Sequence, residues 1–182
     1  AGCVGEFWTE IHVAHRPRLA AWGVEAMKAK GVRFGKGLQM TNVLRDLARD
    51  LRNGRCYLPQ TDLARLGLEP ADLLDPGAIR RVRPLVTELL ALTLEHYDAG
   101  WEYTLAIPRS EWRMRLACAW PLLIGLRTLG LLAESPNLLD PHEKIKIPRS
   151  MVYSILLRSL LLVRSNRLLA AEAKRLRARG PV

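Results

Sequence analysis

Apolar residues recur along most of the chain with the spacing of three to four that is typical of α-helices, and no stretch alternates as a β-strand does. The pattern predicts helices over residues 1–14, 18–30, 32–53, 79–107, 109–133 and 150–179. Gly31 is expected to end the second of these helices, and Pro108 to end the fourth. About half of the residues (49%) are apolar and 6% are aromatic, which fits a leucine-rich helical core. We therefore expect a single all-α domain over residues 1–182.

Three of the predicted helices carry distinctive apolar faces. In the first helix the expected inner face consists of Val4, Phe7, Trp8 and Ile11. In the last helix the residues expected to face inward are Leu156, Leu160, Val163 and Leu168. The helix over residues 109–133 approaches the length of a membrane span, but Pro121 and Arg127 interrupt its apolar run. We interpret it as the central helix of the domain.

The helix over residues 32–53 has three different faces. At about 100° per residue, its apolar face contains Met40, Val43, Leu44, Leu47 and Leu51. The adjacent face, an arc of roughly 80°, contains Gln39, Asn42, Asp46 and Asp50. A third face contains Arg45, Arg49 and Arg52.

The oxygen-bearing face suits a hard divalent cation. Mg²⁺ takes oxygen ligands and keeps several waters, so Asp46 and Asp50, one turn apart, with Asn42 could hold it together with substrate phosphates. Arg45 could bind a diphosphate through two hydrogen bonds. The alternative is a solvated face on which Arg45 forms an ion pair with Asp46 or Asp50. Carboxylates with this spacing are common on surfaces, and they repel unless a cation lies between them.

The wider segment GLQMTNVLRDLARDLRNGRCYLP, residues 37–59, closely resembles the second aspartate-rich region of the squalene and phytoene synthase family. The pattern Q-x-T-N-(I/V)-x-R-D-x-x-x-D, followed by G-R-x-Y-(L/F)-P, is matched by Gln39, Thr41, Asn42, Val43, Arg45, Asp46, Asp50, Gly54, Arg55, Tyr57, Leu58 and Pro59. The chain departs from it at Arg49, where many members have Glu, and this version is similar to that of hopanoid-pathway relatives. The opening A-G-x-V-G and the segment K-I-K-I-P-R-S resemble the family as well.

The resemblance implies an isoprenoid synthase-type helical bundle around a central cavity, with its N-terminal helices missing from this chain. It also implies the head-to-head condensation of two prenyl diphosphates, farnesyl or geranylgeranyl diphosphate, to squalene, dehydrosqualene or phytoene. In that reaction Mg²⁺ assists ionisation of the diphosphate, and a cyclopropyl intermediate forms and rearranges. NADPH is a further cofactor where the product is reduced.

The resemblance also implies roles for individual residues. Asp46, Asp50 and Asn42 would hold Mg²⁺, and Arg45 would bind diphosphate. The substrate cavity would be lined by Gln39, Arg55, Tyr57, Gly2 and Val4. Tyr57 would act on cations or protons in the active site. The alternative for Tyr57 is a ring that covers the core beneath its loop.

The sequence has one aspartate-rich helix where the family has two. We expect the first motif to precede Ala1, so that the chain holds half of an active site, binds Mg²⁺-diphosphate weakly and is inactive alone. Two other interpretations remain: a non-catalytic helical subunit, and a lipid-associated helical module in which the two aspartates have no chemical role.

The formal charge of +10 favours polyanionic partners. Nucleic acid is not expected, because the arginines are spread along the chain without a recognition motif. The last helix is basic toward its end, which a helix dipole explains and which would also suit the surface of an anionic membrane. Three cysteines without a C-x-x-C pair suit a reducing cytoplasm. We therefore expect a cytoplasmic protein that associates peripherally with a membrane.

Overall fold

The computed structural model describes residues 1–177, and this part of the chain forms α-helices, loops and short 3₁₀ turns without a β-strand. The helices are α1 (Gly2–His15), α2 (Val24–Arg45), α3 (Leu47–Arg52), α4 (Gln60–Arg65), α5 (Ile79–Ala106), α6 (Trp112–Glu134), α7 (Arg149–Leu162) and α8 (Asn166–Arg177). The 3₁₀ turns are Pro17–Leu19, Pro70–Leu74 and Pro76–Ala78. The all-α prediction is confirmed. Ala178 and Arg179, the end of the last predicted helix, lie outside the described residues.

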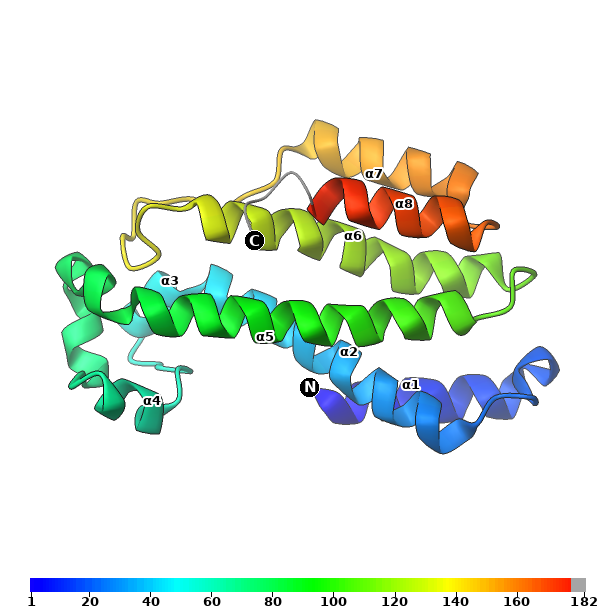
Figure 1. Ribbon diagram of the computed structural model, residues 1–182, viewed down its shortest axis with the longest axis horizontal. Helices are drawn as coiled ribbons and strands as arrows, with labels where there is room; N and C mark the ends of the chain where they lie inside the picture. Colours follow the sequence, from blue (N-terminus) through cyan, green and yellow to red (C-terminus); the bar gives the residue numbers. More distant parts are fainter. Residues whose placement is uncertain (178–182) are drawn as a thin grey trace.

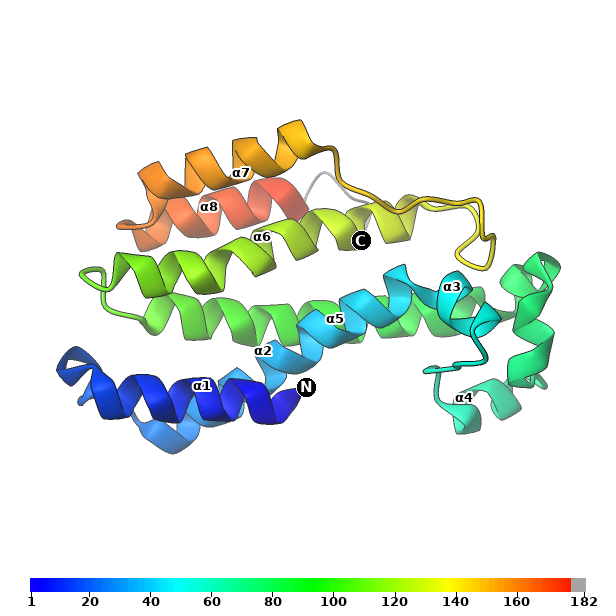
Figure 2. The same cartoon turned by 180° about the vertical axis from the view of Figure 1, so that it is seen from behind.

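Three long helices, α2, α5 and α6, form the body of the molecule (Figure 1). α1 lies along the first part of α2, and the hairpin of α7 and α8 covers α6 on the far side. α3, α4 and the 3₁₀ turns Pro70–Leu74 and Pro76–Ala78 gather at the end where α5 begins. Seen from behind, α2 crosses in front of α5, and α1 lies in front of the first part of α2 (Figure 2). α2 packs against both α5 and α6, and α3 follows it directly along the chain.

The core is dominated by leucines of α5 and α6. Leu122, Leu123 and Leu132 of α6 have no exposed surface, and Val82 and Val86 of α5 are equally buried. Within residues 1–177, α6 is the one helix whose length and composition would suit a membrane span, yet 61% of its apolar window is buried inside the protein. This burial agrees with its interpretation as a central helix.

Gly31 does not end a helix, contrary to the prediction. The chain forms a 3₁₀ turn at Pro17–Leu19, and α2 begins at Val24 and continues through Gly31 to Arg45. Gly31 faces Gly5 of α1: a Cβ added at Gly5 would lie 1.9 Å from the Gly31 carbonyl oxygen, and one at Gly31 would lie 2.6 Å from the Gly5 carbonyl oxygen. The glycine that resembles a helix stop therefore serves a close crossing of two helices.

Two predicted helices are divided. The helix expected over residues 32–53 changes direction at Asp46, whose φ of −97° and ψ of 8° separate α2 from α3, while its end at Asn53 and Gly54 (φ +72°) is confirmed. The helix expected over residues 150–179 is divided between Leu162 and Asn166. At this point the buried Arg115 of α6 donates hydrogen bonds to the Val163 carbonyl (2.8 Å) and to Asn166 Oδ1 (2.6 Å).

The predicted inner face of the first helix is wrong. Val4, Phe7, Trp8 and Ile11 are 64%, 61%, 36% and 39% exposed. α1 contacts α2 instead through its small residues, and Thr9 is its one fully buried side chain among those described. In the last helix Val163 is buried as predicted and Leu156 is half-buried, but Leu160 and Leu168 face outward. In both cases the apolar pattern alone does not identify the side that a neighbouring helix covers.

Candidate functional site

Asp46 and Asp50 lie where α2 gives way to α3. The amide of Asp46 donates to the Asn42 carbonyl (2.9 Å), and the amide of Asp50 donates to the Asp46 carbonyl (2.9 Å). The two aspartates therefore keep the one-turn spacing of a helix despite the change of direction. Their side chains are mostly buried, with 19% and 17% of the surface exposed. Leu44, Leu47 and Leu51 anchor this segment in the core.

Two arginines neutralise this pair of aspartates. Arg45 donates two hydrogen bonds from its guanidinium to the Asp46 carboxylate, through Nη2–Oδ2 (2.7 Å) and Nε–Oδ1 (3.3 Å). Arg49 lies between the carboxylates, with Nη2 3.0 Å from Asp46 Oδ2 and Nε 3.9 Å from Asp50 Oδ1. The hydrogen bond from Arg45, followed by the charges of both arginines, lowers the pKa of Asp46. Asp46 is therefore ionised at neutral pH, the form in which a carboxylate can bind a cation.

The donor set fits a cation that completes its coordination with water and phosphate. Within residues 1–177 no cluster holds three or more carboxylate, imidazole or thiol groups. Two carboxylates one turn apart can still supply one or two ligands to Mg²⁺, which is commonly bound in this way together with substrate phosphates. A cation would take the place that the Arg49 guanidinium now occupies between Asp46 and Asp50.

A polar pocket of about 650 Å³ opens beside Asp46. Three segments line it: the end of α2 with α3, the middle of α6, and the loop before α7. The lining residues are Arg45, Asp46, Ala48, Arg49, Ile124, Thr128, Pro141, Glu143, Lys144, Ile145, Lys146 and Ile147. Four basic groups against two acidic ones make the pocket suitable for an anion. Lys144 and Lys146 were not predicted as site residues, although their K-I-K-I-P segment resembles the family.

A second, apolar pocket of about 160 Å³ lies further back along α2. Its lining comes from α1, α2, α5 and α6 and consists of Val4, Gly5, Trp8, Gly31, Phe34, Gly35, Leu38, Tyr103, Ala117, Cys118 and Pro121. Burial raises the pKa of Cys118 to about 12 and that of Tyr103 to about 12, so both groups are neutral. The pocket is therefore an uncharged space with several aromatic rings in its wall.

The two pockets follow each other along the same pair of helices. On α2 the apolar pocket reaches Leu38 and the polar pocket begins at Arg45; on α6 the apolar pocket reaches Pro121 and the polar pocket begins at Ile124. The offset between them is seven positions along α2 and three along α6, which corresponds to about 10 Å and about 5 Å of helix. An elongated molecule with an apolar tail and an anionic head would match this order.

A buried tyrosine of α5 packs against α2, the helix that leads to the aspartates. Tyr97 of α5, 1% exposed, lies 2.9 Å from Thr41 Oγ1, and its ring also contacts Gly37. On the side of α6, a Cβ at Gly125 would lie 1.8 Å from the Tyr97 hydroxyl oxygen. Sequence reasoning did not identify Tyr97 because its partners lie on other helices.

The structure brings some of the predicted site residues together and leaves others apart. Asp46, Asp50 and Arg45 form one cluster, and Val4 lines the apolar pocket. Five others line neither pocket: Gln39, Asn42, Arg55 and Tyr57, which are exposed, and Gly2, which lies against Val32. Tyr57 is 54% exposed. The roles assigned to all nine residues stay predictions.

Comparison with known proteins places these features in context. A model of the squalene/phytoene synthase family matches residues 1–151. The chain is 28% identical over 149 residues to the squalene synthase of Cyberlindnera jadinii, and 38% identical over 106 residues to the phytoene synthase of Mycobacterium tuberculosis. These matches cover 80% and 57% of this chain, but only 32% and 34% of the two relatives. The match thus spans about a third of the length of these two curated relatives.

Proposed function

Because the chain belongs to the squalene/phytoene synthase family, we propose that it contributes to the head-to-head condensation of two prenyl diphosphates. The observation that carries the proposal is the order of the two pockets along α2 and α6: an uncharged aromatic pocket followed by a basic one. A prenyl diphosphate has the same order, a hydrocarbon chain followed by two phosphates. The apolar pocket would bury the hydrocarbon chain, and the basic pocket would neutralise the phosphates of the same substrate molecule.

The basic pocket would hold the diphosphate. Arg45 and Arg49 come from the aspartate segment, and Lys144 and Lys146 from the loop opposite. Asp46 and Asp50, with Asn42 as a neutral oxygen donor, would bind Mg²⁺, which supplies charge neutralisation to a leaving diphosphate. Arg49 would then exchange partners, from the two carboxylates to the phosphate oxygens, so the resting ion pairs keep both the aspartates and the arginine charged and oriented.

The apolar pocket would hold the hydrocarbon. Trp8, Phe34 and Tyr103 present aromatic rings to it, and such rings can stabilise an allylic cation without reacting with it. The neutral Cys118 thiol adds no charge that would trap the cation. We propose that the reaction proceeds through formation and rearrangement of a cyclopropyl intermediate. The substrate is proposed to be farnesyl or geranylgeranyl diphosphate, and NADPH would be used where the product is reduced.

This chain is proposed to form one wall of the active site rather than all of it. Within residues 1–177, one segment, the junction of α2 and α3, carries the paired aspartates. We propose that a second aspartate-rich helix, from outside the 182 residues, faces it. The chain alone should then bind a prenyl diphosphate with Mg²⁺ but release no hydrocarbon.

The test is binding of farnesyl thiolodiphosphate, an analogue that ionises poorly, measured by calorimetry with and without Mg²⁺. We expect the analogue to bind more tightly than either inorganic diphosphate or farnesol, and Asp46→Ala to reduce the Mg²⁺-dependent affinity at least tenfold. Asp62→Ala, which removes a half-buried carboxylate of α4 that pairs with Arg65, is the matched control. Unchanged binding in Asp46→Ala would contradict the proposed role of the aspartates and favour the lipid-associated module.

Turnover distinguishes the remaining possibilities. The chain is incubated with farnesyl or geranylgeranyl diphosphate, Mg²⁺ and NADPH, and the hydrocarbons are analysed by mass. Product from the chain alone would refute the proposal of half an active site. A longer chain that adds a first aspartate-rich helix should form the product; a folded longer chain that binds the analogue and forms none would favour the non-catalytic subunit.

A further inference from the structure

The outward face of α7 is apolar. Tyr153, Leu157, Leu160 and Leu161 are 63%, 65%, 46% and 84% exposed and fall within an arc of about 100° on the helix. The opposite side of α7 is buried against the body of the protein through Ile155 and Ser159. α7 is thus apolar toward the core and apolar toward the outside, which is unusual for a helix on the surface of a globular protein.

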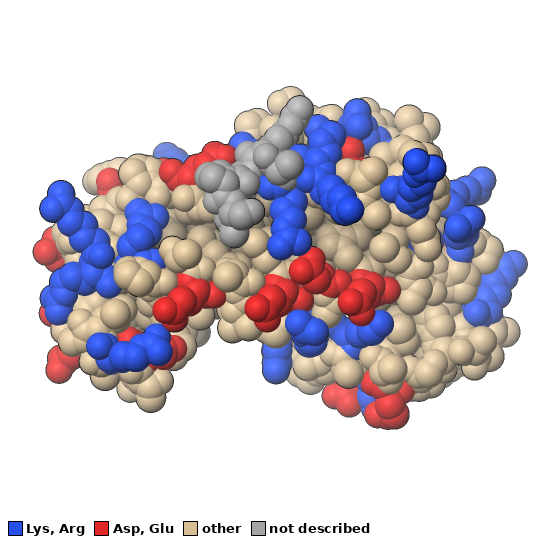
Figure 3. All heavy atoms as spheres, in the orientation of Figure 1, with Lys and Arg blue, Asp and Glu red and all other residues tan. Residues whose placement is uncertain are grey.

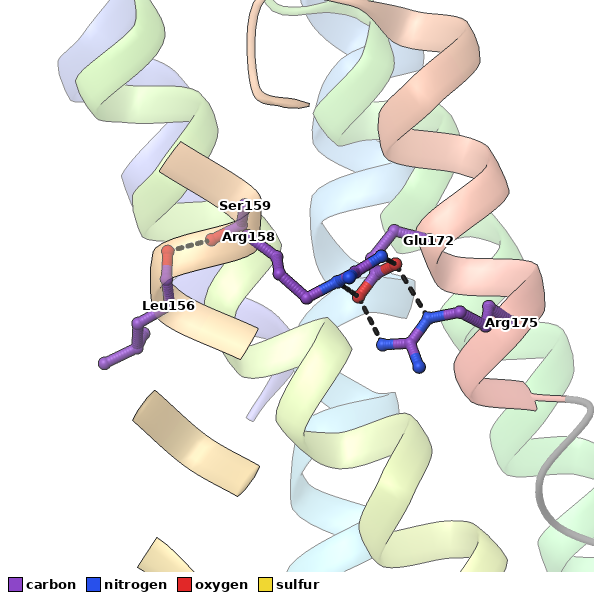
Figure 4. A network of polar contacts seen from close by, with 5 residues as sticks. All are labelled: Leu156, Arg158, Ser159, Glu172 and Arg175. Atoms are coloured by element: carbon purple, nitrogen blue, oxygen red, sulfur yellow. Dashed lines mark hydrogen bonds and ion pairs between the residues drawn. The ribbon is translucent and has the colours of Figure 1, made fainter. Parts of the chain in front are cut away.

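The surroundings of this face are basic. Residues 149–177 contain seven basic residues and one acidic residue, Glu172. Glu172 is 3% exposed and held by Arg158 (Nε–Oε1, 3.0 Å) and Arg175 (Nη2–Oε1, 2.6 Å), as Figure 4 shows. In Figure 3, Lys and Arg side chains are frequent over the part of the molecule that α7 and α8 form. The exposed rim of Arg149, Arg164 and Arg167 therefore has no free carboxylate within the hairpin to pair with.

We propose that the α7–α8 hairpin docks the protein on an anionic lipid surface, with α7 lying in the interface. Leu157, Leu160 and Leu161 would enter the boundary between headgroups and acyl chains, while the arginines of the rim contact lipid phosphates. Tyr153, with an apolar ring and a polar hydroxyl, suits the same boundary.

The chemistry of this face favours lipid over a second copy of the chain and over nucleic acid. A second copy of the chain would set arginine rims against each other, because α7 has no acidic residue to complement them. Nucleic acid would engage the arginines but would leave three exposed leucines without a partner. A bilayer with anionic headgroups satisfies both the apolar face and the charges.

The proposal does not depend on the condensation reaction. The match to the family model ends at residue 151, so Leu157, Leu160 and Leu161 lie beyond the matched segment. The paired aspartates and both pockets described above use no residue of the apolar face. Loss of lipid binding should therefore leave binding of farnesyl thiolodiphosphate unchanged.

The test is co-sedimentation of the 182-residue chain with vesicles of phosphatidylcholine alone or with 30% phosphatidylglycerol. We expect binding to the anionic vesicles that weakens at high salt. Leu157→Ser/Leu161→Ser should reduce the partition coefficient at least tenfold. Arg164→Gln/Arg167→Gln should reduce it by about fivefold per residue, the effect of about 1 kcal/mol for each basic group near an anionic surface.

Matched pairs elsewhere on the surface serve as controls. Leu74→Ser/Leu92→Ser removes two exposed leucines, and Lys36→Gln/Arg80→Gln removes two exposed charges. Circular dichroism verifies that each variant is folded. Equal vesicle binding by the α7 pair and its control would overturn the proposal. So would a dimer detected by light scattering that Leu157→Ser/Leu161→Ser abolishes, or binding of an RNA oligomer that is stronger than vesicle binding and sensitive to the arginine pair.

Discussion

The hydroxyl of Tyr97 donates a hydrogen bond to the hydroxyl of Thr41, one residue before Asn42 on the helix that leads to the aspartates. The direction follows from the second contact of Thr41, whose single hydroxyl proton is given to the Gly37 carbonyl at 2.9 Å. Both side chains are buried, and burial raises the pKa of Tyr97 to about 12. Because the ring lies between Gly37 of α2 and Gly125 of α6, it sets the separation of the two helices that line both pockets.

Gly125→Ala should therefore destabilise the protein, although Gly→Ala inside a helix usually stabilises it. The new Cβ would lie 1.8 Å from the Tyr97 hydroxyl oxygen and 2.7 Å from the ring carbon that bears it, so Tyr97 or α6 must move. We expect the free energy of unfolding in urea to fall by about 1–3 kcal/mol, the usual range for overpacking a core.

Two further variants make this prediction specific. Gly23→Ala, whose Cβ would meet nothing closer than 3.9 Å, should change the free energy of unfolding only slightly. Tyr97→Phe should lose about 1 kcal/mol through its hydrogen bond and should reduce the penalty of Gly125→Ala, since the nearest atom is gone. Strictly additive effects of Tyr97→Phe and Gly125→Ala would show that the two residues do not conflict.

Arg49→Gln should increase the affinity for Mg²⁺. The substitution removes a cation that lies between Asp46 (3.0 Å) and Asp50 (3.9 Å), so a metal no longer has to displace it. We expect Mg²⁺ to bind several-fold more tightly by calorimetry at fixed ionic strength. Arg65→Gln, which removes an exposed arginine paired with Asp62 and Glu88, is the control. An affinity that falls or stays the same would argue that the metal binds without using both carboxylates.

The helices themselves could be predicted from the sequence because their apolar spacing is local. The predictions that were wrong concern features that depend on contacts with another helix. Gly31 resembles a helix stop, but Gly5 of α1 approaches it so closely that any side chain would collide. The division of the last helix depends on Arg115, some 50 residues earlier, which satisfies carbonyl and side-chain acceptors at residues 163 and 166.

The candidate site shows the same limit. Asp46, Asp50 and Arg45 share one short segment, so helical spacing was enough to group them. Lys144 and Lys146 lie almost 100 residues later, beyond both α5 and α6. No local pattern predicts that their loop returns to the end of α2; only the packing of the long helices does. The outward face of α7 could not be predicted for a related reason: both sides of the helix are apolar, so the sequence pattern does not identify the exposed side.

Glu172 should make stability depend on pH in the acidic range. The hydrogen bonds from Arg175 and Arg158 lower its pKa from 4.5 to about 2 in the folded protein (Figure 4). Its stabilising contribution is therefore complete above pH 5 and is lost as the pH falls toward 2. Glu172→Gln should be less stable than the parent by about 2 kcal/mol at pH 7, with the difference vanishing near pH 2. Glu134→Gln, a half-exposed carboxylate of α6, is the control; a pH-independent difference for Glu172→Gln would contradict the assignment.

Arg115 should be one of the most sensitive positions of the chain. Its guanidinium has no exposed surface and donates to the carbonyls of Ile107 and Val163 and to the Asn166 side chain. Arg115→Met would leave these buried acceptors unsatisfied and should lower the free energy of unfolding by about 3–5 kcal/mol. Arg113→Met, an exposed neighbour two residues earlier, should change it by less than about 0.5 kcal/mol. Similar losses for the two variants, measured by urea unfolding, would refute the specific role of Arg115.

Lys144→Ala and Lys146→Ala should each weaken binding of inorganic diphosphate about fivefold to tenfold, because each removes a charged donor from the polar pocket. The loss should be present without Mg²⁺ and should shrink at high salt, since these lysines are exposed and their interactions are screened. Asp46→Ala, by contrast, should reduce only the Mg²⁺-dependent part of the affinity. Lys36→Ala, which removes an exposed lysine outside the pocket, is the control, and Glu143→Gln should strengthen binding by removing a negative charge from the wall. If both pocket lysines behaved like Lys36, the anion would have to lie away from this loop; a loss that appeared only with Mg²⁺ would instead indicate that the lysines act through the aspartates.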